Sequence, residues 1–108
     1  MKQYRVFVSP AANDRMLDHF EFLARVSEKA AHSLLSKLVE DIQSLEFMPQ
    51  ANPYFDLPYL EQVKYWYKLS YRRYRIVYQV FNDTVFVEDI QDCRQDDDKS
   101  LLWQDEQA

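Results

Sequence analysis

The chain has 108 residues, the size of one domain, because so short a chain cannot bury two independent hydrophobic cores. It contains no glycine, which excludes the glycine-rich phosphate-binding loops of dinucleotide-binding and P-loop proteins. Its net charge of −5 at pH 7 argues against non-specific adhesion to nucleic acid. We therefore expect one domain over residues 1–108 that ends in an acidic tail, about residues 95–108.

The single cysteine, Cys93, excludes an intrachain disulfide and a thiol-rich metal cage, and this suits a reducing compartment. Near the N-terminus the apolar run is only Val6–Val8, too short for the hydrophobic region of a signal peptide. No stretch approaches the length of a membrane span. The expected location is the cytoplasm, without a membrane partner.

Two helices are predicted after a short first strand. Alternating apolar residues predict a strand over Tyr4–Val8. Ser9 is placed to cap a helix that begins at Pro10 and ends near Val26, and Ser27 to cap a second helix. Because the break between them is very short, we expect an antiparallel hairpin. The apolar stripes comprise Met16, Leu17, Phe20, Leu23 and Ala24, then Ala31, Leu34, Leu35, Leu38, Ile42 and Leu45.

A proline-bearing loop over residues 47–60 precedes three segments with strand periodicity: Val63–Ser70, Tyr74–Phe81 and Thr84–Gln91. Asn82 and Asp83 between the last two favour a tight hairpin turn, since both residue types tolerate positive φ. The predicted fold is α+β: an N-terminal strand and a helical hairpin packed on one face of a mostly antiparallel sheet whose last three strands form a meander.

The strand register predicts one apolar and one cationic face. A turn centred between Tyr71 and Arg72 places Leu69 opposite Tyr74 and Lys68 opposite Arg75. Across the next hairpin, Arg75 then faces Ile90 and Val77 faces Glu88. The helices must cover the apolar face, formed by Val63, Tyr65, Tyr67, Leu69, Tyr74, Ile76, Tyr78 and Val80. The open face then carries Lys64, Trp66, Lys68, Arg75, Gln79 and Glu88.

Positive charge is concentrated in residues 64–75, where five basic residues occur without an acidic one. Two like charges at Lys68 and Arg75 need compensation, and two interpretations stay open. Glu88 forms an ordinary surface ion-pair cluster with them, or a bound phosphate bridges them. Trp66 has two interpretations of equal weight: it stacks a nucleobase, or it is covered by Leu101, Leu102 and Trp103.

Metal chemistry is not expected. His19 and His32 lie in helical segments without a second ligand at metal spacing, and Cys93 has no histidine nearby. The acidic run Asp96–Asp98 has the character of a solvated stretch. We predict no metal and no other cofactor.

The order of elements, with Ser9-Pro10-Ala11-Ala12 and especially the stretch Tyr74–Val80, resembles the RelE/ParE toxins of bacterial type II toxin-antitoxin modules. The resemblance covers residues 4 to about 95. For the RelE branch it implies metal-independent, ribosome-dependent cleavage of mRNA, in which a 2′-hydroxyl attacks the adjacent phosphate. It implies a catalytic role for Arg75, Lys68 and, within a one-residue shift, Arg94.

Other positions depart from that branch. The first of the family's two strand lysines falls on Trp66, and the C-terminal tyrosine is replaced by Leu101, Leu102 and Trp103. Substrate-binding roles are assigned to Trp66, Lys64, Arg72 and Arg73. The ribosome-dependent endonuclease is the first hypothesis, with the ribosome and mRNA as partners.

Two alternatives stay open: a ParE-like inhibitor that binds DNA gyrase, and a toxin-fold interaction module without toxicity. Either toxin branch implies a cognate antitoxin as partner.

Overall fold

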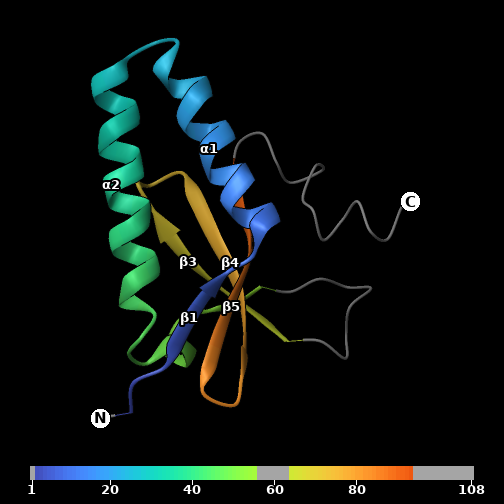
Figure 1. Ribbon diagram of the computed structural model, residues 1–108. Helices are drawn as coiled ribbons and strands as arrows, with labels where there is room; N and C mark the ends of the chain where they lie inside the picture. Colours follow the sequence, from blue (N-terminus) through green and yellow to red (C-terminus); the bar gives the residue numbers. More distant parts are fainter. Residues whose placement is uncertain (1, 56–63, 94–108) are drawn as a thin grey trace.

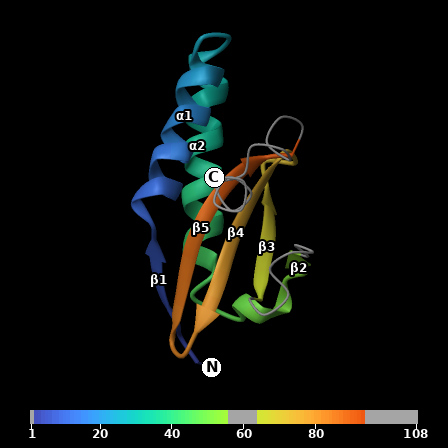
Figure 2. The same cartoon turned by 90° about the vertical axis from the view of Figure 1, so that its right-hand side faces the viewer.

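The computed structural model describes residues 2–55 and 64–93. One five-stranded sheet has the order β1-β5-β4-β3-β2, and two helices lie on one of its faces (Figures 1 and 2). Strand β1 pairs in parallel with β5, whereas all other neighbours are antiparallel, and β3, β4 and β5 form a meander. The predicted α+β fold is thereby confirmed. The strands are β1 (Arg5–Val8), β2 (Tyr54–Phe55), β3 (Tyr65–Ser70), β4 (Tyr74–Phe81) and β5 (Thr84–Asp92).

Both helices begin at the serines predicted to cap them. Helix α1 (Pro10–Ala24) follows Ser9, whose hydroxyl accepts a hydrogen bond of 3.0 Å from the Ala12 amide. Helix α2 (Glu28–Ser44) follows Ser27, whose hydroxyl accepts one of 3.1 Å from the Ala30 amide. Each cap satisfies a backbone N–H that has no partner within the helix.

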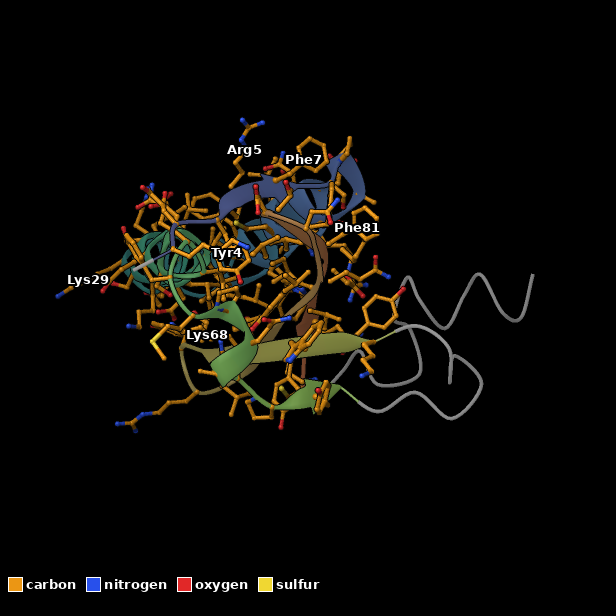
Figure 3. All side chains as sticks on the ribbon, turned by 90° about the horizontal axis from the view of Figure 1, so that it is seen from below. Tyr4, Arg5, Phe7, Lys29, Lys68 and Phe81 are labelled. Carbon is orange, nitrogen blue, oxygen red and sulfur yellow. The ribbon has the colours of Figure 1, made fainter. Side chains whose placement is uncertain are left out.

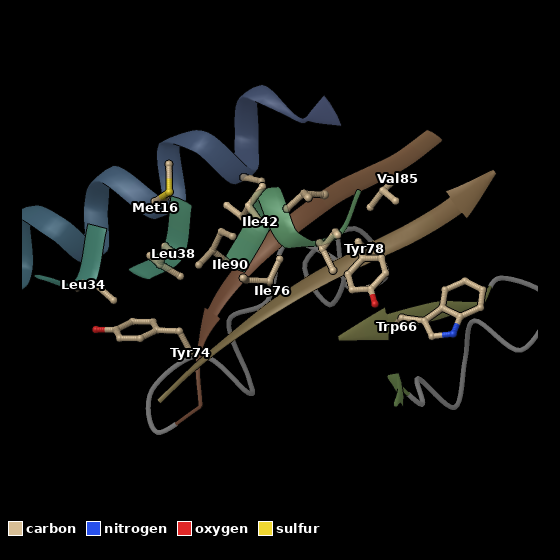
Figure 4. Packing of buried hydrophobic residues seen from close by; sticks show 13 residues of the cluster. Met16, Leu34, Leu38, Ile42, Trp66, Tyr74, Ile76, Tyr78, Val85 and Ile90 are labelled. Carbon is tan, nitrogen blue, oxygen red and sulfur yellow. The ribbon is translucent and has the colours of Figure 1, made fainter. Parts of the chain in front are cut away.

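The hydrophobic core lies between the helical hairpin and the facing side of the sheet (Figure 4). The predicted stripe of α2 is confirmed, with Leu35 only partly buried. In α1 the prediction is wrong for Leu17, which is 43% exposed, whereas Ala12, absent from the predicted stripe, is buried. Buried residues of α2 and the following turn are Ala31, Leu34, Leu38, Ile42 and Leu45.

The β3–β4 register differs by one residue from the prediction. Ser70, not Leu69, lies opposite Tyr74, because the connection has three residues instead of an even number. Tyr71 and Arg72 adopt positive φ angles of 51° and 62°, and the Arg73 amide bonds the Ser70 carbonyl. Since side chains alternate along a strand, this shift turns the whole of β3 over. Lys68 and Trp66 therefore face the helices, while Leu69 and Tyr67 face away.

Strand β5 carries an irregularity that the sequence did not reveal. The pairing follows the expected register from Phe81 opposite Thr84 to Tyr78 opposite Val87, and then shifts by one residue. The shift is the mark of a β-bulge, which leaves Glu88 without an opposite partner. In consequence Arg75 lies opposite Gln91 and Val77 opposite Asp89, which corrects the predicted pairs with Ile90 and Glu88.

The loop after α2 contains a short 3-10 helix (Pro49–Ala51) and leads into β2. The buried Tyr78 hydroxyl donates to the Pro49 carbonyl and accepts a hydrogen bond of 2.9 Å from Asn52 Nδ2. Burial raises the pKa of Tyr78 to about 12, although the bond from Asn52 acts in the opposite direction. Within the described residues, no helix has the length and apolar character needed to cross a membrane.

Candidate functional site

Lys68 lies on the helix-covered face of the sheet, not on the open face. Its Nζ donates a hydrogen bond of 2.5 Å to Ser44 Oγ and lies 3.9 Å from Asp41 Oδ1. Lys37 Nζ lies 3.3 Å from the same carboxylate oxygen. The buried Asp41 thus sits between two ammonium groups, and Lys68 joins β3 to the end of α2.

Trp66 belongs to the hydrophobic core. Its side chain is 6% exposed, and its ring stacks on Tyr78 at 6.3 Å and 16°, at one end of the cluster in Figure 4. The Tyr54 ring lies 5.3 Å away, opposite Trp66 in the β2–β3 pairing. The prediction that Trp66 lies on the open face is wrong, and the one-residue shift of β3 explains why. Leu101, Leu102 and Trp103, the predicted cover, lie outside the described residues.

Arg75 lies on the opposite face of the sheet from Lys68. It is half-buried and stands opposite Gln91, whose Nε2 donates a hydrogen bond of 3.2 Å to Asp89 Oδ2. The other Asp89 oxygen accepts 2.9 Å from the Ile90 amide and lies 3.2 Å from Arg15 Nε of α1. Asp89 is fully buried, and these contacts compensate the free-energy cost of burying its charge.

The remaining basic residues that we predicted to bind substrate, Lys64, Arg72 and Arg73, have different surroundings. Arg73 donates to Asp92 Oδ2 through Nε at 3.0 Å and Nη2 at 2.7 Å. This hydrogen bond raises the pKa of the Arg73 guanidinium, with burial acting in the opposite direction. Arg72 is exposed in the β3–β4 turn, and Lys64 Nζ lies 5.9 Å from the centre of the Tyr54 ring. Arg94 lies outside the described residues.

Of the predicted catalytic residues, the structure describes Lys68 and Arg75, and these two do not lie together as expected. Lys68 and Arg75 project from opposite faces, so the like-charge contact that called for a bridging phosphate does not exist. Glu88 does not lie opposite Arg75 in the register. Burial raises the pKa of the Glu88 carboxyl. What sequence reasoning missed is the buried polar network of Arg15, Asp89 and Gln91.

The histidine in α1 has a structural contact. His19 Nε2 lies 2.7 Å from the Ile90 carbonyl oxygen, and its ring lies 5.0 Å from the Tyr74 ring. His32 packs edge-on against Phe20 at 5.2 Å. Over residues 2–55 and 64–93 no cluster of histidine, cysteine or acidic side chains has the arrangement of a metal site.

The face of the sheet away from the helices carries exposed aromatic side chains. Phe7 of β1 and Phe81 of β4 are 52% and 68% exposed, and both project from the face away from the helices (Figure 3). The Phe86 ring contacts Phe7 edge-on at 6.0 Å. We call Phe7, Phe81 and Phe86 the aromatic patch. Clustered exposed apolar groups of this kind mark interaction surfaces.

Within residues 2–55 and 64–93, the chain forms a helical hairpin on one face of a sheet whose last three strands form a meander. Residues 6–97 match the family model for the ParE toxin of the type II toxin-antitoxin system parDE, so the chain belongs to the ParE toxin family.

The fold is also similar to that of a solved chain titled as the chromosomal ParDE system from P. aeruginosa. That match has a TM-score of 0.68 at 9% identity and covers 85% of this chain and 98% of that one. Among curated protein sequences, none matches the chain significantly.

Proposed function

We propose that this toxin inhibits DNA gyrase by binding and does not cut mRNA. The observation that carries the proposal is the separation of Lys68 and Arg75 on opposite faces of the sheet. Membership of the ParE family supports the same branch. As a type II toxin it has a cognate antitoxin as its partner.

The chemistry of RNA cleavage explains why this separation matters. Attack by a 2′-hydroxyl needs a proton acceptor, a cation beside the developing phosphorane charge and a donor for the leaving oxygen, all within hydrogen-bond reach of one phosphate. The ammonium of Lys68 is hydrogen-bonded to Ser44 at the C-terminal end of α2 and lies beside Asp41. Lys68 and Arg75 therefore do not contact one phosphate together. This separation supports a function that does not require Lys68 and Arg75 to act on one phosphate.

Binding, by contrast, needs an exposed surface, and the aromatic patch supplies one. Phe7 and Phe81 are large apolar side chains in contact with water, so their burial against a partner is favourable. We assign contact with gyrase to this patch. An aromatic anchor of this kind commonly dominates the free energy of a protein interface.

The test compares two activities of the purified protein. We expect inhibition of gyrase in a plasmid supercoiling assay and intact mRNA in a ribosome-dependent cleavage assay. Lys68→Met keeps the aliphatic stem of the side chain and should leave gyrase inhibition unchanged. Cleavage of mRNA by the wild type that disappears in Lys68→Met would establish the endonuclease instead.

A second pair of variants tests the assigned surface. Phe7→Ser combined with Phe81→Ser should weaken gyrase inhibition at least tenfold. The matched control is Phe22→Ser on α1, which removes a ring of similar exposure, 50%, from another surface. Melting curves verify that both variants fold. If the wild type affects neither gyrase nor mRNA, the interaction module without toxicity is the better description.

A further inference from the structure

Strand β1 forms an open edge of the sheet. It pairs with β5 on one side, and Figure 2 shows it at one margin of the sheet with β2 at the other. The Arg5 and Ser9 amides donate to carbonyls of β5 and of the turn before it. Because alternate residues of a parallel strand bond the same neighbour, the N–H and C=O groups of Val6 and Val8 point outward. Over the described part of the chain, neither valine has a backbone hydrogen bond on that side.

This edge lacks the features that usually prevent further pairing. Charged side chains, prolines and bulges protect the edges of natural sheets, and the stretch Val6–Val8 contains none of them. The two valine side chains pack against the core, whereas Phe7 between them is 52% exposed on the other face. Among the described strands, the opposite edge β2 has two residues, so β1 is the edge that favours addition of a strand.

Both ends of β1 limit which strand can be added. At its start, the Tyr4 amide donates a hydrogen bond of 2.8 Å to the Glu46 carbonyl, so the segment after α2 occupies the outer side there. At its end, Pro10 has no N–H and begins α1. The open hydrogen-bonding positions are therefore Val6 and Val8, and a fitting strand needs only two such residues of its own. Strand β1 has this pattern itself.

We propose that two copies of this chain pair through β1, antiparallel, with Phe7 on the twofold axis. In this register Val6 of one copy lies opposite Val8 of the other, and each such pair exchanges two hydrogen bonds. A register centred on Val6 places Tyr4 opposite Val8, and one centred on Val8 places Pro10 opposite Val6. Neither Tyr4 nor Pro10 has an amide hydrogen to donate, so the axis at Phe7 gives the most hydrogen bonds.

The same register joins the exposed rings. The Phe7 residues of the two copies form a pair without mutual hydrogen bonds, whose Cα atoms lie about 4.5 Å apart. Each Phe7 ring also contacts Phe86 at 6.0 Å, so four rings form one cluster and withdraw apolar surface from water. The two Arg5 residues lie four positions apart along the pair, about 13 Å, and repel each other little beyond the Debye length of about 8 Å.

The size of the contact predicts a reversible dimer. A four-residue edge with two rings from each copy lies below the area of about 1,200 Å² that marks weak and transient complexes. The dimer fraction should therefore rise with protein concentration. Phe7 is shared with the aromatic patch, but Phe81 lies two strands from the axis and stays outside the dimer contact. The inference does not depend on the gyrase contact proposed for that patch.

The experiment measures the mass of the full chain by analytical ultracentrifugation over a range of concentrations. The wild type should change from monomer to dimer as its concentration rises. Phe7→Lys places two ammonium groups on the axis and should weaken dimerisation at least tenfold. The control is Phe81→Lys, which adds the same charge at a position that is 68% exposed and should change dimerisation less than twofold. Melting curves verify that both variants fold.

Two further arms test the register. Phe7→Glu alone should be monomeric, and mixing it with Phe7→Lys should restore a dimer, because opposite charges then meet on the axis. In a Cys93→Ser background, Phe7→Cys should form an intermolecular disulfide on mild oxidation, whereas Arg5→Cys should not, because the two copies of that position lie too far apart.

A wild type that stays monomeric at every concentration, equal weakening by Phe81→Lys, or no recovery on mixing would overturn the proposal. So would extended peptides from a displayed library that bind the Val6–Val8 edge of a monomeric wild type, since the edge would then serve a different protein.

Discussion

Truncation of Trp66 is the most direct test of the observed strand register. The substitution Trp66→Ala removes a side chain that is 6% exposed and stacked between the rings of Tyr54 and Tyr78. Loss of a buried tryptophan costs about 3–5 kcal/mol, of which about 0.5–1.5 kcal/mol per ring pair comes from the aromatic geometry. Domains of this size have total stabilities of about 5–15 kcal/mol, so the variant is close to the limit of folding.

This cost translates into a large thermal shift. An unfolding entropy of about 2.1 cal/mol/K per residue over 108 residues means that each kcal/mol lowers the melting temperature by about 4.4 °C. We therefore expect a decrease of about 13–22 °C for Trp66→Ala in calorimetry, and a matching loss in urea unfolding at 25 °C. Trp66→Phe keeps one ring in the stack and should lose less than half as much.

Tyr54→Ala serves as the matched control for this measurement. Tyr54 stands on the outer side of the same stack but is 61% exposed, so its removal should cost less than about 1 kcal/mol. Should Trp66→Ala melt within about 4 °C of the wild type, the ring is not packed in the core. The observed β3 register would then be wrong, and the predicted open face would be correct.

Three further predictions concern contacts described above. Because the pKa of Tyr78 is raised, its neutral form favours the folded state. This stability is complete below pH 10 and is lost as pH rises towards 12, about 3 kcal/mol in all. In urea unfolding, Tyr78→Phe should lack this alkaline decline, and an equal decline in both proteins would contradict the burial argument. Arg73→Ala should lower the unfolding free energy by about 2–3 kcal/mol, because it leaves the buried Asp92 carboxylate with fewer donors. Arg73→Lys should lose only part of this free energy. Unchanged urea midpoints would show that the ion pair is dispensable. Ser27→Ala should cost about 1 kcal/mol through the lost bond to the Ala30 amide, and a thermal shift below 1 °C would argue against the cap.

Most of the fold follows from local patterns in the chain. Ser9 and Ser27 begin the two helices because a serine hydroxyl satisfies a free N–H at a helix start, a purely local requirement. Strand β4 begins at Tyr74 and ends at Phe81, as the period of two predicts, and Asn82 takes the positive φ that its side chain tolerates. These signals lie within a few residues of the element that they define.

The arrangement of the basic residues could not be obtained in the same way. Lys68 and Trp66 change face if the β3–β4 connection is one residue longer, and no local signal distinguishes Tyr71 and Arg72 at positive φ from a two-residue turn. The bulge at Glu88 likewise reverses the later half of β5.

Tertiary packing determines both the register of β3 and the bulge in β5. Alternation along β3 puts Tyr65, Tyr67 and Leu69 on one face and Trp66, Lys68 and Ser70 on the other, so the face that the helices cover is the less apolar of the two. Stacking of Trp66 on Tyr78 and the contact of Lys68 with Ser44 of α2 stabilise one of them. A pattern of period two specifies that faces alternate, but only the contacts across the sheet and with the helices determine which face is buried.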